Sequence, residues 1–396
     1  MSTSSYLAPA YDLEALRSQF EVTQEGIAYL NHAGMSPLPR LVKQAMLDAV
    51  EAMAQQGSGV YTSLLAPLEQ QLHEQVARLV NASPDEVAFV ENTSIGINFI
   101  AQSLPLQPGD NVLLCDVEFP ANVYPWQNLA SKGVETRLLP SRQGGLSLEA
   151  LDSARDAHSR VVAVSGVQFF TGRREDLFAI GEYCAEHGLW LIVDGMQAVG
   201  IVPLDMRAMG IHALVAGGQK ALLAPPGQGF MVVRADLIEH LQPVFVGPLS
   251  VINHEHWLRY DLTLKPGARR FDLGTSNIAG LAGLLAAVNL LLEVGVEHIA
   301  NWVTHLSDVA IRDLVARGYR VITPLEPEQH ANIVTFAIDG DPDAITAALG
   351  GRGIILRPHL DAAGNPYLRI STHGYNTENE VLRVAEVLEE IDYEQY

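Results

Sequence analysis

Two residues that could do covalent and acid–base chemistry each follow an apolar segment of the chain. The segment LWLIVD ends in Asp194, and the GMQ that follows places Gln197 close behind it. The segment HALVAGGQK ends in Lys220, before the tight sequence LLAPPGQG. In open α/β sheets, ligands bind at the carboxyl edge of parallel strands. The sequence therefore predicts that Asp194 and Lys220 meet in one cleft.

These two residue types suit one cofactor chemistry. A partly desolvated lysine amine can be neutral and attack an aldehyde, and a carboxylate beside a pyridine nitrogen keeps that ring protonated as an electron sink. The pair predicts pyridoxal 5'-phosphate (PLP) held as a Schiff base on Lys220, with Asp194 facing the ring nitrogen. No GxGxxG follows the first strand and no GxxxxGK[ST] is present, which argues against a nicotinamide dehydrogenase or a nucleotide enzyme.

Composition excludes several classes of partner. The 396 residues have a formal net charge of −21, which repels polyanions and anionic lipid surfaces, so we expect neither a nucleic acid nor a membrane partner. Cys115 and Cys184 lie in apolar runs, and MSTSSYLAPAYD lacks the features of a signal peptide, so we expect a cytoplasmic protein. His254 and His256 have no further ligands at metal-binding spacing, and no metal is expected.

The elements around Asp194 and Lys220 alternate between strands and helices. The near-continuous apolar runs VAFVE, NVLLCD, VVAVS, LWLIVD and GFMVVR predict buried parallel strands. Helical patterns lie between them, one of them over residues 121–131. We expect an α/β fold in which a mostly parallel central sheet is flanked by helices, followed by a small C-terminal α+β domain. The predicted boundaries are an N-terminal arm over residues 1–41, a large domain over 42–275 and the small domain over 276–396.

Several strings, in order, carry a family resemblance: YLNHAG, ENTSIGIN, EFPANVYPW, VDGMQAVG, GGQK, FDLGTSN and YLRIS. Together they resemble the class V aminotransferase and cysteine desulfurase family of fold-type I PLP-dependent enzymes, over nearly the whole chain. The resemblance implies the PLP-dependent transferase fold and a cofactor bound in the large domain.

The resemblance also implies roles for residues around the cofactor. Thr93 and Ser94 follow a strand and begin a helix, whose N-terminus favours an anion, so they would bind the cofactor phosphate. Phe119, within EFPANVYPW, would stack on the pyridine ring, although many relatives carry a histidine there. Gln197 would donate a hydrogen bond to the phenolic oxygen of the cofactor, and Gln219 stands where many relatives have a histidine before the lysine.

Other positions are implied on the substrate side and at a subunit boundary. In SGVQFFTG, Phe169 falls where desulfurases carry an asparagine, which leaves Gln168 as a polar neighbour of the cofactor. Arg369 would bind the substrate carboxylate through its guanidinium group. Thr275 in FDLGTSN would reach the cofactor phosphate of the other subunit, which predicts a homodimer. In addition, two residues of the N-terminal arm would line the substrate pocket: Asn31 and His32.

The reaction itself is ranked from general family usage. An aminotransferase acting on a small amino acid comes first, with a β-lyase of the cysteine or cystine C–S type and an epimerase as alternatives. A noncatalytic protein that keeps the fold for binding is the alternative outside enzymes. The segment from Arg357 to Arg369 contains no cysteine. A desulfurase that carries sulfur as a persulfide is therefore not expected.

Overall fold

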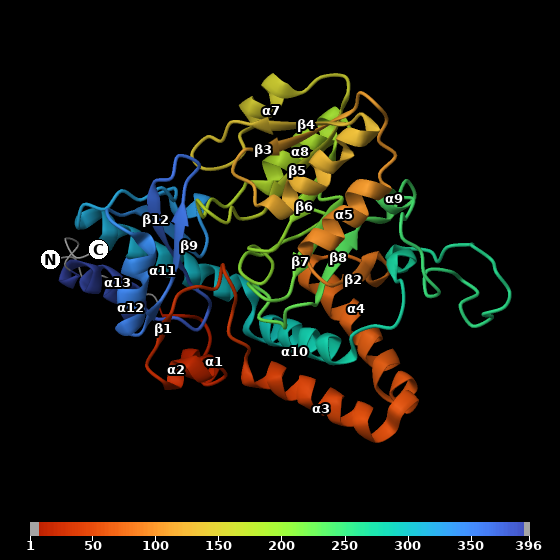
Figure 1. Ribbon diagram of the computed structural model, residues 1–396, viewed down its shortest axis with the longest axis horizontal. Coiled ribbons are helices and arrows are strands. Elements are labelled where there is room, and N and C mark those ends of the chain that lie inside the picture. Colours follow the sequence, from red (N-terminus) through yellow and green to blue (C-terminus); the bar gives the residue numbers. More distant parts are fainter. Residues whose placement is uncertain (1–7, 392–396) are drawn as a thin grey trace.

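The computed structural model describes residues 8–391, and its centre is a seven-stranded sheet. The strands lie in the order β2-β8-β7-β6-β5-β3-β4, and only β8 runs antiparallel to its neighbours. Figure 1 shows this sheet between two layers of helices. The strands are β2 (Val87–Val90), β3 (Asn111–Cys115), β4 (Glu135–Leu139), β5 (Ser159–Ser165), β6 (Trp190–Asp194), β7 (Ala213–Gly217) and β8 (Gly229–Val233).

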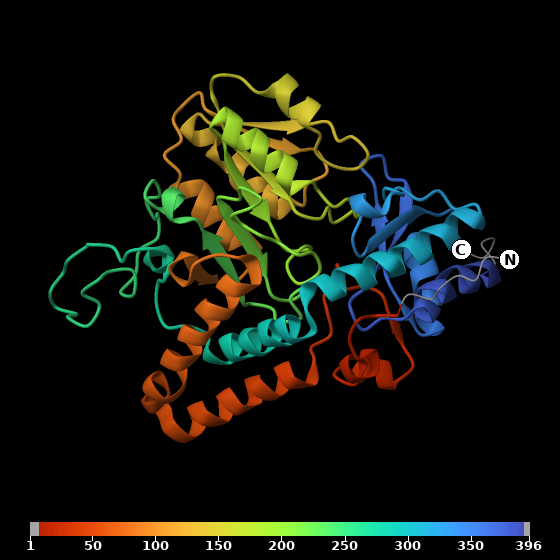
Figure 2. The same ribbon diagram turned by 180° about the vertical axis from the view of Figure 1, so that it is seen from behind.

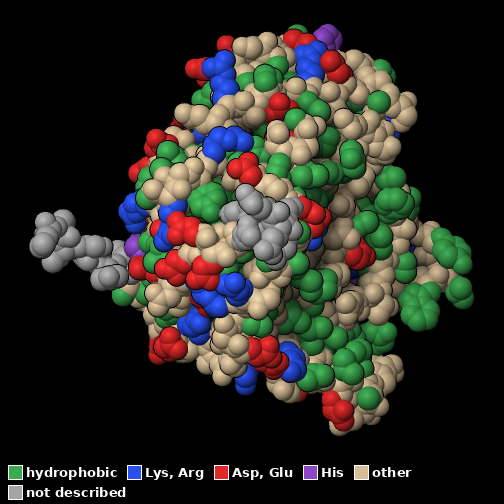
Figure 3. All heavy atoms as spheres, turned by 60° about the vertical axis from the view of Figure 1, so that its left-hand side comes forward, with side chains coloured by type: hydrophobic (Ala, Val, Ile, Leu, Met, Phe, Trp, Pro, Cys, Tyr) green, Lys and Arg blue, Asp and Glu red, His purple; other side chains and the backbone are tan. Residues whose placement is uncertain are grey.

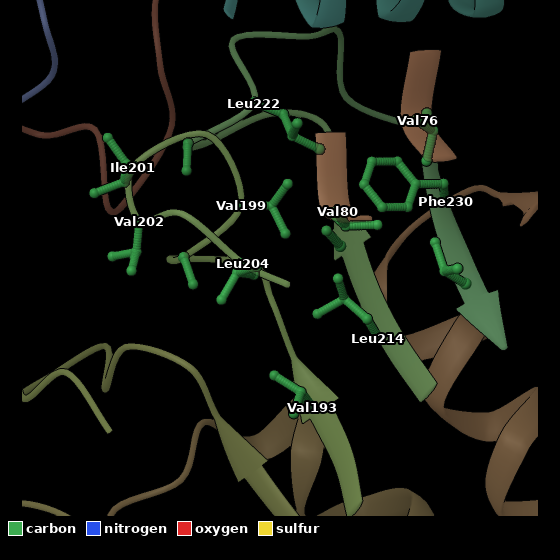
Figure 4. Packing of buried hydrophobic residues seen from close by; sticks show 14 of the residues in the cluster. Val76, Val80, Val193, Val199, Ile201, Val202, Leu204, Leu214, Leu222 and Phe230 are labelled. Carbon is green, nitrogen blue, oxygen red and sulfur yellow. The ribbon is translucent and has the colours of Figure 1, made fainter. Parts of the chain in front are cut away.

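The inner strands of the sheet are mostly apolar because helices cover both of its faces. In β6, Leu191 and Val193 belong to one hydrophobic cluster, whereas Ile192 between them belongs to the cluster on the opposite face. Figure 4 shows the first cluster, where Val193 lies among side chains from the neighbouring strands and from α4 (Ala66–Val80). A strand buried on both faces does not alternate between apolar and polar residues.

The helices divide between the two faces of the sheet. Buried side chains of α4, α8 (Leu177–His187) and α10 (Ile278–Val294) belong to one cluster. Those of α5 (Thr93–Ser103), α6 (Tyr124–Gln127) and α9 (Ala235–Ile238) belong to the other. The shorter α7 (Leu148–Ala154) adds Leu151 to the first cluster, and α3 (Arg40–Gln56) packs along α10.

The C-terminal part forms a second, smaller core. Here β9 (Ile333–Ala337), β11 (Arg357–Leu360) and β12 (Pro366–Ser371) form an antiparallel sheet with β12 in the middle. This sheet shares a hydrophobic cluster with α11 (Val296–Ala316), α12 (Pro342–Gly351) and α13 (Glu378–Glu390). Figure 2 shows α11 running from α10 along this part of the molecule.

The N-terminal segment lies against the C-terminal part. It contains α1 (Leu13–Arg17), α2 (Glu21–Gln24) and β1 (Ala28–Tyr29), and β1 pairs in parallel with β10 (Ile354–Ile355). Arg17 donates to the backbone oxygen of Tyr375 and pairs with Glu380. The first seven residues of the predicted arm lie outside the described residues. The predicted division into an arm, a large domain and a small domain stays a prediction.

Most predicted elements are present, with three differences. The strand β8, which was expected to run parallel to the others, is antiparallel to both of its neighbours. The strand β4 has no counterpart among the expected strands, because it is an edge strand whose sequence, ETRLL, is partly exposed and charged. The continuous helix expected over 121–131 is broken into 3₁₀ turns around the four-residue α6.

Within residues 8–391, no single helix is long and apolar enough to cross a membrane. The pair α10 and α11 meets that test only jointly, and the two are bent by 78°.

Candidate active site

A cavity of about 550 Å³ lies where the carboxyl ends of β5, β6 and β7 face the C-terminal part. Its lining comes from the N-terminal segment, the central sheet and the small sheet together. The lining residues are Asn31, Ala33, Gly34, Met35, Asn92, Thr93, Ser94, Phe119, Ala121, Ser165, Phe169, Asp194, Met196, Gln197, Gln219, Lys220, Arg357, His359 and Arg369. Most of the residues singled out from the sequence therefore meet in one cavity.

Lys220 follows β7 through a short turn and lies on the cavity wall. Burial and the guanidinium of Arg369 lower the pKa of its amine, the carboxylate of Asp194 opposes this shift, and the resulting pKa is about 8. Its Nζ lies 5.1 Å from the centre of the Phe119 ring. The backbone oxygen of Lys220 accepts a hydrogen bond from Ser36, which fixes the turn. The amine is thus held in the cavity with a sizeable neutral fraction near neutral pH.

Asp194 ends β6, and its side chain is 4% exposed. Burial raises the pKa of this carboxyl to about 7, the backbone N–H of Met196 lowers it, and the nearby carboxyl of Glu118 raises it. A cation at this point, such as a protonated pyridine, would stabilise the charged carboxylate. Gln197 lies on the turn after Asp194, and its Nε2 donates to the backbone oxygen of Ala33 at 3.0 Å.

The N-terminus of α5 supplies a site for an anion. Asn92 caps the helix by accepting the N–H of Ile95, and Thr93 accepts the N–H of Gly217 at 3.0 Å. Thr93 is thereby tied to β7, three residues before Lys220. Ser94 lies next to it on the cavity side. The free N–H groups of the first helical turn and these hydroxyls suit a phosphate.

The position of Phe119 is fixed by the hydrogen bonds of the preceding residue, Glu118. The carboxyl of Glu118 is buried and accepts both the N–H and the Oγ–H of Ser165, the last residue of β5. This links the loop after β3 to the edge of the sheet beside Asp194. The ring of Phe119 is 40% exposed toward the cavity and meets Phe169 edge-on, with 5.1 Å between the ring centres.

Arg369 brings the small sheet to the cavity. It lies on β12, is 3% exposed, and its Nη1 donates to the backbone oxygen of Phe169 at 2.7 Å. Its Nε is buried and has no hydrogen-bond partner within residues 8–391. A guanidinium group with open donors beside a reactive amine is suited to hold the carboxylate of an amino acid.

Three predicted residues lie elsewhere. His32 is buried and does not line the cavity, and its Nδ1 lies 2.7 Å from Ser36 Oγ. Gln168 is buried outside the cavity lining, and its Nε2 donates hydrogen bonds to both Glu118 and Glu175. Thr275 is exposed and lines a separate hollow with neighbouring residues. Its predicted contact would require a second copy of the chain.

Several lining residues were missed from the sequence. Arg357 and His359 occupy alternate positions of β11, and in a strand such positions share one face. That period-two spacing in RPH, before the turn that leads to YLRIS, is the signal that could have identified them. The lining residue Ser165 gave no such signal, because its contact with the buried Glu118 joins distant parts of the chain.

The cavity contains three groups that fit PLP. Lys220 offers an amine for the aldehyde, Asp194 a buried carboxyl for the pyridine nitrogen, and Thr93 with Ser94 a helix N-terminus for the phosphate. Buried polar atoms without a partner in the described chain also lie among the lining residues, namely Asn31 Oδ1 and Gln219 Oε1. The residues present therefore fit this cofactor. Within residues 8–391, no group of three or more metal-ligating side chains occurs.

Three relatives are similar to this protein over almost the whole chain. A probable cysteine desulfurase of Methanothermobacter thermautotrophicus is 30% identical over 92% of this chain and 94% of its own length. A probable cysteine desulfurase of Aeropyrum pernix is also 30% identical, over 97% of this chain and 98% of its own. A cysteine desulfurase of Salmonella agona is 30% identical over 95% and 97%.

Solved structures share the fold. A cysteine desulfurase of Thermococcus onnurineus superposes with a TM-score of 0.88 at 23% identity, covering 98% of this chain and all of that one. The cystine C-S lyase C-DES, in complex with cysteine persulfide, gives 0.84 at 24% identity over 92% of this chain and 98% of its own. A variant of C-DES carries glycine covalently linked to its PLP cofactor and gives 0.86 over 95% and 99%.

These findings correct the predicted reaction. The prediction of an aminotransferase is wrong, because the relatives are cysteine desulfurases and a structural neighbour is a C–S lyase. The expectation that ruled out a desulfurase is overturned by the same relatives. The segment between Arg357 and Arg369 contains no cysteine that could carry a bound sulfur. This does not exclude the removal of sulfur from a substrate.

The predicted cofactor and fold are confirmed. The family model described as Aminotransferase class-V matches residues 28–384, which includes every lining residue of the cavity. The mostly parallel sheet flanked by helices is the architecture of the PLP-dependent neighbours. The chain belongs to the class V aminotransferase family of fold-type I, PLP-dependent enzymes.

Proposed function

We propose that this protein cleaves the Cβ–S bond of cysteine or of a cysteine-derived amino acid such as cystine. The observation that carries the proposal is the convergence of Lys220, Asp194 and Arg369 on one cavity, in a chain whose relatives are named for this chemistry. When bound, PLP withdraws electrons from the Cα of an amino acid, so that the bonds at Cα and Cβ become labile.

The residues of the cavity divide the work between binding and proton transfer. Thr93 and Ser94 would hold the phosphate, Asp194 the pyridine nitrogen, and Phe119 the face of the ring. Arg369 would hold the substrate carboxylate and orient Cα toward Lys220. The Nζ of Lys220 would take the proton from Cα of the bound substrate.

The fate of the sulfur has two balanced forms. In elimination, the Cβ–S bond breaks, the sulfur leaves with the electron pair, and water completes the conversion of cysteine to pyruvate, ammonia and sulfide. In sulfur transfer, cysteine and a thiol give alanine and a persulfide, so that sulfur leaves cysteine without loss of its amino group.

The cysteines of the chain bear on where such a thiol would come from. Cys115 on β3 and Cys184 on α8 are fully buried, burial raises the pKa of each thiol to about 12, and neither lines the cavity. A thiol that takes sulfur in this cavity would therefore enter as a second substrate.

The working unit would be a homodimer. The exposed position of Thr275, away from the cavity of its own chain, supports a contact with the cofactor of a second copy. The side chains of Trp257, Leu258 and Tyr260 are 82%, 88% and 90% exposed in the single chain. Large apolar side chains gathered in this way are typical of an association surface.

Product analysis tests the proposal. The purified protein, loaded with PLP, would be incubated with L-cysteine or L-cystine, with and without an added thiol, and pyruvate, alanine, sulfide and persulfide would be quantified. Sulfur release with either pyruvate or alanine supports C–S cleavage and tells elimination from sulfur transfer. Turnover of amino acids to keto acids with no release of sulfur would overturn it.

A further inference from the structure

Three basic side chains form the wall of the cavity that the small sheet provides. Arg357 and His359 lie on β11, and Arg357 is directly opposite Arg369 in the register with β12. Directly opposite residues of an antiparallel pair point to the same face, and alternate residues of one strand do so too. All three side chains line the cavity.

Protein carboxylates do not neutralise this wall. Within residues 8–391, neither Arg357 nor Arg369 has an acidic partner within ion-pair distance. The one acidic residue in the lining is Asp194, whose place is at the cofactor ring. Arg369 is buried, and a buried charge is ordinarily paired, so its missing partner is an anion from outside the chain. Arg357 is exposed at the cavity, where its guanidinium group is open to a second anion.

The open donors show where such an anion would bind. The described chain contains no hydrogen-bond partner for the buried Nε of Arg369 or for the buried Nε2 of His359. Burial, followed by Arg369 and Arg357, lowers the pKa of His359 to about 3, so its ring is neutral and can donate one hydrogen bond. Phe169 and Phe170 meet this ring edge-on and fix its orientation.

The two guanidinium groups of the wall predict how many acidic groups the ligand carries. A simple amino acid brings one carboxylate, which satisfies Arg369 and leaves Arg357 without a counterion. We propose that the cavity selects amino acids whose side chain ends in a second acidic oxyanion, with Arg357 as the residue that determines this specificity. His359 would donate a hydrogen bond to the same oxyanion.

The inference rests on the proposed function for the identity of the substrates. If the reaction is C–S cleavage, the favoured substrates are cysteine derivatives with an acidic group beyond the sulfur. Cystine, which carries a second carboxylate, and S-sulfocysteine, which carries a sulfonate, meet this description. Cysteine itself has no second acidic oxyanion and would bind less tightly.

Binding of matched amino acids tests the inference without any C–S bond. Dissociation constants of the PLP-loaded protein would be measured by calorimetry for L-aspartate against L-asparagine, and for L-glutamate against L-glutamine. Each pair differs by one charge at nearly constant shape. In at least one pair, we expect the acid to bind at least about 10-fold more tightly than the amide, because a hydrogen bond between charged groups is stronger than one to a neutral group.

Variants assign the preference to one residue. Arg357→Gln should reduce the ratio to less than about 2-fold, and Arg357→Lys, which keeps the charge, should retain part of it. Arg40→Gln removes an exposed arginine at the start of α3, outside the lining, and should leave the ratio unchanged. Equal affinities for acid and amide in both pairs, or a ratio that Arg357→Gln does not alter, would overturn the inference.

A comparison of sulfur substrates separates this inference from the proposed function. The specificity constant kcat/KM would be measured for S-sulfo-L-cysteine and S-methyl-L-cysteine. If neither these nor cysteine and cystine are cleaved while acids still bind better than amides, the proposed function fails and the specificity stands. If C–S bonds are cleaved but acidic and neutral ligands bind alike, the specificity fails and the function stands.

Discussion

The reactivity of Lys220 depends on two neighbours of opposite charge. Burial and Arg369 lower the pKa of its amine to about 8, and Asp194 acts in the other direction. A nucleophilic lysine must lose its proton before it attacks an aldehyde, so the balance of these groups sets the pH at which the cofactor can be bound.

The pH dependence of cofactor binding follows from this balance. Because the pKa of Lys220 is below that of a free lysine, the neutral fraction rises as the pH passes about 8. We expect the rate at which PLP is taken up by the cofactor-free protein, followed by absorbance, to rise with a midpoint near pH 8. In Arg369→Gln the midpoint should move to higher pH. A wild-type rate that still climbs steadily beyond pH 10 would contradict the assigned environment.

The sequence predicts site residues well where a residue type and its place at a strand end agree. Lys220, Asp194 and Thr93 were found in this way, and all three line the cavity. Some positions implied by resemblance alone lie outside the cavity lining. Gln168, for example, is buried and donates hydrogen bonds to two carboxyl groups. Arg357 was missed because its position depends on which strand pairs with which.

At the scale of elements, α5 shows how packing positions the phosphate site. Gly96 faces β7, and a Cβ atom there would lie 2.4 Å from Cγ1 of the buried Val215. The absence of a side chain lets the helix approach the strand closely. The same approach allows Thr93 to bind the backbone of Gly217.

A methyl group at this contact should be costly. We expect Gly96→Ala to reduce the free energy of unfolding by roughly 1–3 kcal/mol through overpacking, and to weaken PLP binding by displacing the start of α5. Gly350 in α12 has no atom within 4 Å of an added Cβ, so Gly350→Ala should instead stabilise the protein by about 0.5–1 kcal/mol. Denaturant unfolding measures both. Equal stability of Gly96→Ala and the wild type would show that the contact is not tight.

The elements were predictable to the extent that burial determined their composition. Strands covered on both faces stand out in the sequence, as in β6, which is apolar up to the Asp194 that ends it. The edge strand β4 does not, because its partly exposed faces carry charged residues. The segment around Trp126 shows helical spacing but is interrupted by prolines, and it forms the four-residue α6 between two 3₁₀ turns instead of one continuous helix.

At the scale of the whole molecule, polar and apolar surface are unevenly distributed. Figure 3 shows acidic and basic side chains interspersed over one face, with hydrophobic side chains more frequent on its right-hand half. The segment between α9 and α10 extends away from the sheet in Figures 1 and 2 and contains the exposed Trp257, Leu258 and Tyr260. This segment leads directly to Thr275, so one association surface could include both.

The oligomeric state tests this distribution. We expect sedimentation velocity to give a particle of twice the 43.0 kDa chain mass, and Leu258→Asp to shift it toward the monomer by placing a charge in the apolar contact. Leu325→Asp changes an exposed leucine of the C-terminal part and should leave the dimer intact. A wild-type monomer with full cofactor occupancy would argue against the role assigned to Thr275.

Sulfur release by Lys220 variants tests the central claim most directly. Total sulfide and persulfide released from L-cystine and L-cysteine would be measured for the PLP-loaded wild type, Lys220→Ala and Lys220→Arg, with circular dichroism to verify folding. The account predicts many turnovers for the wild type, the visible absorbance band of a lysine-bound cofactor in the wild type alone, and no sulfur release above background from either folded variant. Release of sulfur by folded Lys220→Ala at the wild-type rate would contradict it.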